Sequence, residues 1–229
     1  MVPHQDHLHP SEPSNEPSAP VETLLATLRQ EGVHDQRVLQ AIRDVPRAQF
    51  VIPELRAHAF ENIALPIEQG QTISQPLMVA VMTQALALNG SEHVLEIGTG
   101  SGYQAAVLAR CARSVVSVER WPLLAEHASR RLKSLGYTTV EVHTGDGTLG
   151  WPPSAPYDAI LVAAAAPEVP PPLLEQLREG GRMVIPIGNP QQQELTLLIK
   201  KRPRIERHHL GACVFVPLIG WAAWHEAHH

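Results

Sequence analysis

The sequence has few cysteines and lacks both long apolar runs and a secretion signal, and each shortage excludes a class of protein. Its two cysteines, Cys111 and Cys213, stand far apart and in no C-x-x-C pattern, so neither a disulfide framework nor a zinc site is indicated. No apolar stretch approaches the length of a membrane span, and the N-terminus lacks a basic-then-apolar pattern. We therefore expect a cytoplasmic protein without a membrane partner, and we expect a monomer.

Basic residues are also in the minority. The chain has 18 Lys and Arg against 23 Asp and Glu, which gives a formal net charge of -5 and an isoelectric point near 6.2. This balance argues against a nucleic-acid partner bound through phosphate contacts. With 229 residues, 44% of them hydrophobic, the chain can bury one full core, as in a single α/β domain.

The two ends of the chain differ from the rest in composition. Residues 1–20 are rich in Pro, Ser, His and Glu and predict a disordered tail, and we assign residues 221–229 to a second, C-terminal tail. The histidines of these segments have no fixed geometry, so no metal site is predicted for them: His4, His7, His9, His225, His228 and His229. Between the tails we predict one domain over 21–220. It comprises a helical, substrate-binding segment, 21–90, and a cofactor-binding α/β core, 91–220.

Apolar spacing predicts the helices of the first segment. One helix is marked by Leu24, Leu25 and Leu28, with Gly32 as its break, and a further helix is expected over Gln75–Leu88. The helix between them is marked by Val38, Leu39 and Ile42.

From His93 onward strands and helices alternate, which predicts a doubly wound, mostly parallel sheet of the Rossmann-like class. Near the end, Pro171–Glu179 is expected to be a helix. The runs Glu194–Ile199 and Ala212–Leu218 have no convincing helix between them and predict an antiparallel edge hairpin. We place a cluster of basic side chains on its connecting loop, where solvation explains them: Lys200, Lys201, Arg202, Arg204, Arg207, His208 and His209.

The most informative motif is a glycine-rich turn after the apolar run Val94–Ile97. Glycines stand at alternate positions, Gly98, Gly100 and Gly102, and Tyr103 occupies the place where a dinucleotide-binding fingerprint needs its third glycine. This spacing suits a flat, phosphate-free ligand end, as in enzymes that bind S-adenosylmethionine. Dense glycines can also mark a tight strand-to-helix connection without a ligand.

Two acidic residues follow at the ends of later strands. Glu119 ends the run Ser114–Glu119, about twenty residues past the turn, where a doubly wound sheet delivers a carboxylate to ribose hydroxyls. Asp146 follows the strand predicted over Thr138–His143 and can accept a hydrogen bond from an adenine amino group. Either acid alone is equally well explained as a helix N-cap or a solvated charge. Together they favour a cofactor, because ligands bind at this edge of an open sheet.

A hydroxyl residue in the segment before the first strand is a second candidate. Ser74 precedes Pro76 at the expected start of a helix, whose free N–H groups favour an anion such as a carboxylate. On spacing alone, an N-cap is the better explanation of this serine.

A set of motifs, taken together in this order, resembles the protein-L-isoaspartate O-methyltransferase family of bacterial type from about Val21 to Leu218. They are Asn62–Ile67, Gly70–Pro76, Val94–Tyr103, Val118–Arg120, Gly145–Gly147, Tyr157–Pro170 and Phe215–Leu218. The Thr72-Ile73-Ser74 motif is the discriminating part, since most other methyltransferases lack it.

The resemblance implies a function and a set of site residues. It implies methyl transfer from S-adenosyl-L-methionine to the free α-carboxylate of L-isoaspartyl residues in damaged proteins and peptides, which starts repair through a succinimide. Ser74 is implied as the active-site residue. Cofactor contacts are implied for Thr72, Glu96, Gly98, Gly100, Gly102, Glu119, Asp146 and Gly147. Substrate contacts are implied for Leu65, Pro66, Ser74 and Val216.

Other functions stay open at this point. A methyltransferase acting on another carboxylate or a small metabolite would share every cofactor feature and differ only around Ser74. A non-catalytic protein that binds the same cofactor would be expected to show a broken glycine turn or no Glu119, and both are intact. Tyr103 and the lack of an obvious proton donor disfavour a nicotinamide dehydrogenase.

Overall fold

The structure of the protein is a computed structural model and describes residues 19–225. Its α-helices are α1 (Ala19–Gln30), α2 (Gln36–Asp44), α3 (Pro76–Ala85), α4 (Tyr103–Cys111), α5 (Pro122–Ser134) and α6 (Pro171–Gln176). The strands are β1 (Leu65–Pro66), β2 (Thr72–Ile73), β3 (His93–Ile97), β4 (Ser114–Glu119), β5 (Val140–Thr144), β6 (Tyr157–Val162), β7 (Leu177–Gly188), β8 (Gln193–Lys201) and β9 (Arg204–Cys213). Short 3-10 helices are η1 (Arg47–Phe50), η2 (Pro53–His58), η3 (Glu68–Gly70), η4 (Gly147–Leu149) and η5 (Pro152–Ser154).

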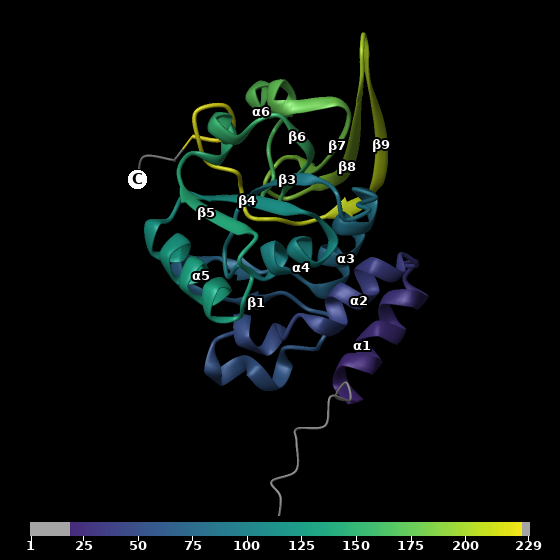
Figure 1. The fold of residues 1–229 in the computed structure, drawn as a ribbon, viewed down its shortest axis with the longest axis vertical. Coiled ribbons are helices and arrows are strands. Elements are labelled where there is room, and N and C mark those ends of the chain that lie inside the picture. Colours follow the sequence, from purple (N-terminus) through teal and green to yellow (C-terminus); the bar gives the residue numbers. More distant parts are fainter. Residues whose placement is uncertain (1–18, 226–229) are drawn as a thin grey trace, which may run out of the picture.

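A seven-stranded sheet with the order β5-β4-β3-β6-β7-β8-β9 organises the molecule (Figure 1). The strands from β5 to β7 are parallel to their neighbours, and β8 and β9 continue the sheet antiparallel. This is the doubly wound, mostly parallel sheet that the sequence predicts. The chain reverses its winding direction at β3, so the carboxyl ends of β3 and its neighbours form the edge at which ligands bind in such sheets.

Apolar side chains cover both faces of the sheet. The larger core joins helices α1 to α5 to one face, and includes Leu25, Leu108 and Leu132. The smaller core packs Leu173 of α6 and Leu218 against the other face. Because both faces are covered, the central strands are apolar on both sides, which explains the continuous apolar runs of the sequence.

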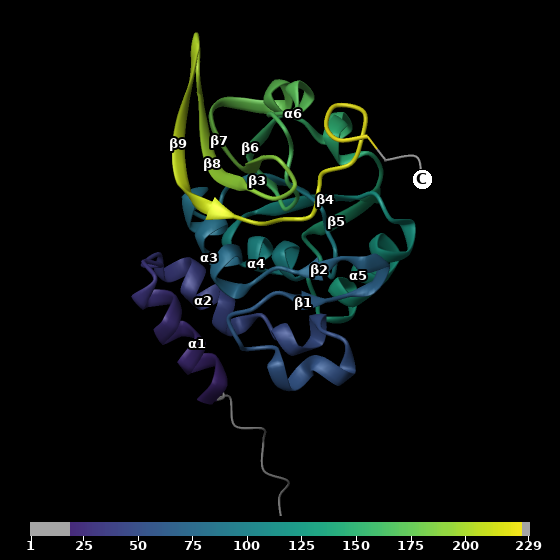
Figure 2. The ribbon, with the colours of Figure 1, turned by 180° about the vertical axis from the view of Figure 1, so that it is seen from behind.

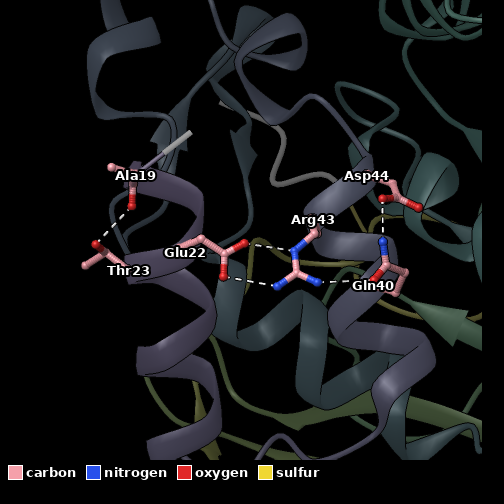
Figure 3. A network of polar contacts seen from close by, with 6 residues as sticks. All are labelled: Ala19, Glu22, Thr23, Gln40, Arg43 and Asp44. Atoms are coloured by element: carbon pink, nitrogen blue, oxygen red, sulfur yellow. Dashed lines mark hydrogen bonds and ion pairs between the residues drawn. The ribbon is translucent and has the colours of Figure 1, made fainter. Parts of the chain in front are cut away.

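Helices α1 and α2 are joined by an ion pair as well as by their apolar faces. Arg43 of α2 donates to both carboxylate oxygens of Glu22 on α1, at 2.9 and 3.0 Å, and its third contact is to Gln40 (Figure 3). The predicted helices are confirmed, with small differences at their ends. Helix α1 begins at Ala19, two residues before the predicted boundary, and the rest of the predicted N-terminal tail lies outside the described residues.

Two predicted helix ends are wrong. The helix expected over Gln75–Leu88 ends at Ala85, because Ala87 has a φ of 49° and cannot continue it. The helix expected over Pro171–Glu179 ends at Gln176, because β7 already begins at Leu177, which pairs with Tyr157 of β6.

The predicted antiparallel edge hairpin is confirmed, but the predicted strand bounds and the predicted basic loop are wrong. Strand β8 extends to Lys201 and strand β9 is Arg204–Cys213, so six of the seven basic residues predicted for the loop lie in these strands, and only Arg202 lies between them. Residues 214–218, predicted as strand, follow the sheet as irregular chain apart from a bridge between Ala165 and Pro217. Strand β9 is exposed along almost its whole length, and the hairpin projects from the body of the molecule (Figures 1 and 2). A strand exposed on both faces has no apolar alternation, so its sequence carries no strand signal.

The C-terminal segment is folded against the domain up to His225. Asp146 Oδ2 accepts a hydrogen bond from the backbone N–H of Trp221 at 2.8 Å, and Thr148 Oγ1 accepts one from Ala222 at 3.0 Å. In Figure 2 this chain crosses from β9 toward β5. The assignment of residues 221–225 to a tail is therefore wrong, and residues 226–229 lie outside the described residues.

Candidate functional site

The glycine turn connects β3 to α4 at the carboxyl edge of the sheet. Gly98, Gly100 and Gly102 have φ values of 92°, 52° and 89°, a backbone conformation that residues with a Cβ rarely adopt. At Gly102 there is also little space, because a Cβ at this position would lie 3.3 Å from Leu132 and 3.4 Å from Ala128 on α5. All three glycines therefore shape the turn, and Gly102 also allows α4 to pack closely against α5.

Glu119 ends β4 beside this turn and holds it in place. Its two carboxylate oxygens accept hydrogen bonds from the backbone N–H groups of Gly100, at 2.9 Å, and Trp121, at 3.0 Å. Each oxygen keeps further acceptor capacity, because a carboxylate can accept about four hydrogen bonds in all. Glu119 thus combines a fixed position with free acceptor sites at the cavity described next.

A cavity of about 560 Å3, part of it open to solvent, lies over the turn. Six of the predicted site residues line it: Thr72, Gly98, Gly100, Glu119, Gly147 and Val216. Its other walls come from strand ends and the C-terminal segment, including Ile97, Val118, Trp121, Ala163, Ala164, Pro217, Leu218 and Ile219. Apolar walls with a carboxylate at one side suit an adenosyl group, whose base is flat and apolar and whose ribose donates hydrogen bonds.

Gly147 lines the wall of the cavity, and the neighbouring Asp146 supports its loop. A Cβ at Gly147 would collide with the side chain of Ile97, so only glycine fits this loop. Asp146 Oδ1 accepts from the N–H and the hydroxyl of Thr148, at 2.9 and 2.7 Å, while Oδ2 accepts from Trp221. Asp146 is not among the residues that line the cavity. An adenine amino group would have to share Oδ2 with the N–H of Trp221.

Glu96 lies beneath the cavity rather than in its wall. The side chain is wholly buried, one oxygen accepts from the hydroxyl of Ser117, and the other has no hydrogen-bond partner within the described chain. Burial raises the pKa of Glu96 to about 8, and the negative charge of Glu119 adds to the effect. A carboxyl group that stays protonated here is consistent with a supporting position under the turn.

The buried Glu96 predicts a pH dependence of stability. In the unfolded chain this carboxyl ionises near pH 4.5, whereas in the folded protein it ionises only near pH 8. Between these values the folded state binds the extra proton, so this contribution to stability is full below about pH 4.5, falls as pH rises, and levels off above about pH 8. We expect the melting temperature of E96Q, relative to that of the unmodified protein, to increase from about pH 5 to about pH 8 and then to level off. If the melting temperatures of the two proteins instead change with pH in the same way across this range, the Glu96 carboxyl is already ionised in the folded protein.

A second cavity adjoins the first and contains Ser74. It is lined by Ala64, Thr72, Ser74, Gln75, Met78, Ala163, Gln191, Gln192, Gln193, Ala212, Cys213, Val214, Phe215 and Val216. Three residues, Thr72, Ala163 and Val216, line both cavities. Two ligands bound in these cavities would therefore face each other across the same three side chains.

The structure argues against Ser74 as a helix cap. The N-cap position of α3 is Gln75, which makes no side-chain capping bond, and the N–H of Leu77 is bonded to Asn62 Oδ1 at 3.0 Å instead. The Ser74 side chain is half-buried at the wall of the second cavity. Its hydroxyl is therefore available for a ligand.

The two remaining candidates, Leu65 and Pro66, lie on the strand that pairs with β2. Leu65 is buried and pairs with Ile73, and Pro66 is exposed and pairs with Thr72, in the small sheet formed by β1 and β2. Neither is among the residues that line the two cavities. They position Thr72 and the residues after it.

Some lining residues were not among the predicted site residues. Ala163 follows the last residue of β6, at the same edge of the sheet as Gly98 and Glu119, so the strand-end rule that selected those two also indicates it. The glutamines from Gln191 to Gln193 carry no comparable signal, because they reach the second cavity from the loop before β8 and through its first residue.

Comparison with known sequences gives a consistent result. The sequence profile of the family "Protein-L-isoaspartate(D-aspartate) O-methyltransferase" matches residues 19–223. A protein-L-isoaspartate O-methyltransferase of Methanoculleus marisnigri is 53% identical over 197 residues, which cover 86% of this chain and 90% of that protein. A relative with the same name from Dictyoglomus thermophilum is 52% identical, over 88% of this chain and 91% of that protein.

Solved structures agree with the sequence comparisons. A protein-L-isoaspartate O-methyltransferase superposes with a TM-score of 0.80 at 33% identity, and the match covers 89% of this chain and 67% of that one. A Plasmodium falciparum protein described under the same enzyme name, in complex with S-adenosyl-L-homocysteine, gives a TM-score of 0.73 at 24% identity. That match covers 86% of this chain and 97% of the other, and it supports the fold.

Proposed function

The chain belongs to the protein-L-isoaspartate(D-aspartate) O-methyltransferase family, and from that premise we propose which residues carry its reaction and how. The enzyme transfers the methyl group of S-adenosyl-L-methionine to the free α-carboxylate of L-isoaspartyl residues in damaged proteins and peptides. The supporting observation is the pair of adjoining cavities that share Thr72, Ala163 and Val216. One cavity suits a methyl donor and the other an acceptor.

The first cavity is assigned to the cofactor. S-adenosyl-L-methionine, when bound, supplies an electrophilic methyl group on a positively charged sulfur. Glu119 would accept hydrogen bonds from the ribose hydroxyls, Gly98 and Gly100 would let the backbone approach the ligand, and Gly147 would accommodate the base; all four residues line this cavity. Asp146 holds the loop that carries Gly147 and joins it to the C-terminal segment. Glu96 is buried beneath the turn and supports it.

The second cavity is assigned to the isoaspartyl residue. Its α-carboxylate has an ordinary pKa of about 3.5 and is ionised at neutral pH, so it is a nucleophile without the help of a general base. The Ser74 hydroxyl donates a hydrogen bond that orients this carboxylate, and Thr72 and Val216 hold the two ligands in line. Rate acceleration then comes mainly from alignment, which can supply about 7–11 kcal/mol.

The product explains the connection to repair. Methylation turns the carboxylate into a methyl ester, whose methoxy group leaves more easily than the oxygen of a carboxylate. The backbone nitrogen of the following residue attacks the ester carbonyl, loses its proton and releases methanol as a succinimide ring closes, and water then opens the ring partly to normal aspartate. Ring closure needs no further residue of the enzyme.

The test is the transfer of labelled methyl groups to a peptide that contains one isoaspartyl residue. The matched control is the same peptide with aspartate. We expect labelling of the isoaspartyl peptide alone, because aspartate presents no free α-carboxylate within a chain. Equal labelling of both peptides would contradict the proposed substrate. Labelling of small carboxylic acids in preference to either peptide would favour a metabolite methyltransferase.

We further propose that the enzyme acts as a monomer in the cytoplasm and needs no nucleic acid. The state of Cys111 and Cys213, both buried free thiols, supports a reducing compartment. Within residues 19–225, no helix is both long enough and apolar enough to cross a membrane.

A further inference from the structure

Arg47 is a wholly buried arginine that binds two separate parts of the backbone. Its Nε donates to the carbonyl oxygen of Ala59, and one terminal nitrogen donates to the carbonyl oxygen of Ser74, each at 2.8 Å. Ala59 precedes the segment that supplies β1, and Ser74 ends the segment that supplies β2. One guanidinium thus fixes both ends of the chain that forms a wall of the second cavity.

The burial of this charge is unusual for a purely structural residue. Among residues 19–225, the other terminal nitrogen of Arg47 has no hydrogen-bond partner, and no carboxylate forms an ion pair with the guanidinium. Burial lowers the pKa of Arg47 below its usual value. A buried charge without a carboxylate reduces the stability of the fold, and an apolar residue of similar volume would avoid that penalty. The position therefore favours a role in which the guanidinium's directed hydrogen bonds matter.

Arg47 also packs against the first residue of the helix that follows the glycine turn. Its guanidinium carbon lies 4.6 Å from the centre of the ring of Tyr103, the first residue of α4. Phe50 packs edge-on against the same ring, with 5.6 Å between ring centres. Arg47 therefore packs on the ring of Tyr103. This is the tyrosine that stands where a dinucleotide-binding motif has its third glycine.

These contacts form a connection between the two cavities. The glycine turn leads into Tyr103, the ring of Tyr103 supports Arg47, and Arg47 holds the carbonyl group of Ser74. We propose that Arg47 is a positioning residue, which fixes the backbone of Ser74 relative to α4 and so directs the Ser74 hydroxyl toward the carboxylate of the bound substrate. This inference rests on the proposed function, because it assigns the substrate carboxylate to the second cavity.

The test compares R47K and R47M with the unmodified enzyme. Lysine keeps the positive charge but cannot bind Ala59 and Ser74 with a planar fork. For both variants, kcat/KM on an isoaspartyl peptide is expected to fall about tenfold or more, as for a lost hydrogen bond to a charged group. The dissociation constant of S-adenosyl-L-homocysteine, measured by calorimetry, is expected to stay within about twofold, because Arg47 does not line the cofactor cavity.

R182K is the matched control. Arg182 on β7 donates to the carbonyl oxygen of Ala85 at the other end of α3, at 3.3 Å, so it makes the same kind of contact away from both cavities. Its kcat/KM is expected to match that of the unmodified enzyme. A second readout is the combination of R47K with S74A. If Arg47 acts through the Ser74 hydroxyl, R47K reduces kcat/KM much less in the S74A background than alone.

Each outcome decides between explanations. An unchanged kcat/KM in folded R47K would overturn the proposal. It would also be overturned if R47K reduced kcat/KM by the same factor in the S74A background as in the unmodified enzyme. A parallel loss of cofactor affinity, or failure of both Arg47 variants to fold, would overturn it as well, because Arg47 would then support the fold as a whole. Failure of the unmodified enzyme to label the isoaspartyl peptide would instead overturn the proposed function.

Discussion

Replacement of Glu119 by alanine is expected to weaken the binding of S-adenosyl-L-homocysteine at least about a hundredfold. The change removes two hydrogen bonds between a carboxylate and ribose hydroxyls, each contributing about 1.5–3 kcal/mol. It also removes the acceptors of the Gly100 and Trp121 N–H groups, so the turn loses its anchor. Isothermal titration calorimetry with S-adenosyl-L-homocysteine measures the effect without turnover.

Two further variants separate the causes. E119Q keeps one carbonyl oxygen and the size of the side chain, so its loss of affinity is expected to be smaller. E141A removes a carboxylate from the adjacent strand β5, where Glu141 is exposed and lies 3.6 Å from His143. Its affinity for the ligand is expected to be unchanged. If folded E119A binds as tightly as the unmodified protein, the carboxylate serves only the architecture of the turn.

The second large effect is expected for S74A, as a loss of turnover rather than of stability. The hydroxyl is expected to donate to the substrate carboxylate, and the loss of such a bond corresponds to a fall of about 10- to 100-fold in kcat/KM on an isoaspartyl peptide. Affinity for S-adenosyl-L-homocysteine is expected to hold, because Ser74 lines only the second cavity.

N62A is the complementary variant, because Asn62 makes the capping contact that the sequence first suggests for Ser74. Its side chain accepts from the N–H of Leu77 at 3.0 Å, and the loss of a helix cap costs about 1 kcal/mol. We expect N62A to lower the melting temperature and S74A to leave it nearly unchanged. The reverse pattern, with a lower melting temperature and full activity per folded molecule for S74A, would assign the serine to the helix.

The sequence is most informative at the strand ends. The glycine turn follows β3, Glu119 ends β4 and Gly147 comes shortly after β5, and the structure brings all three to one cavity. The sequence could not distinguish residues that line the cavity from residues that support it. Glu96 and Asp146 were assigned to the cofactor with the others, but one lies under the turn and the other behind the loop of Gly147. How deeply a side chain is buried depends on the tertiary structure, and it differs between neighbouring positions at the end of a strand.

The sequence by itself determined the class of the sheet, the glycine turn and the residue types at the carboxyl edge, because strand and helix periodicity and backbone conformation are local properties. Only the tertiary structure decided the course of β9, the attachment of residues 221–225 to Asp146 and Thr148, and the contacts of Arg47. In each of these three cases backbone N–H or carbonyl groups of residues distant in the sequence form the bonds. Every residue type carries a carbonyl group, and all but proline carry an N–H, so the identity of such a partner leaves no mark in the sequence.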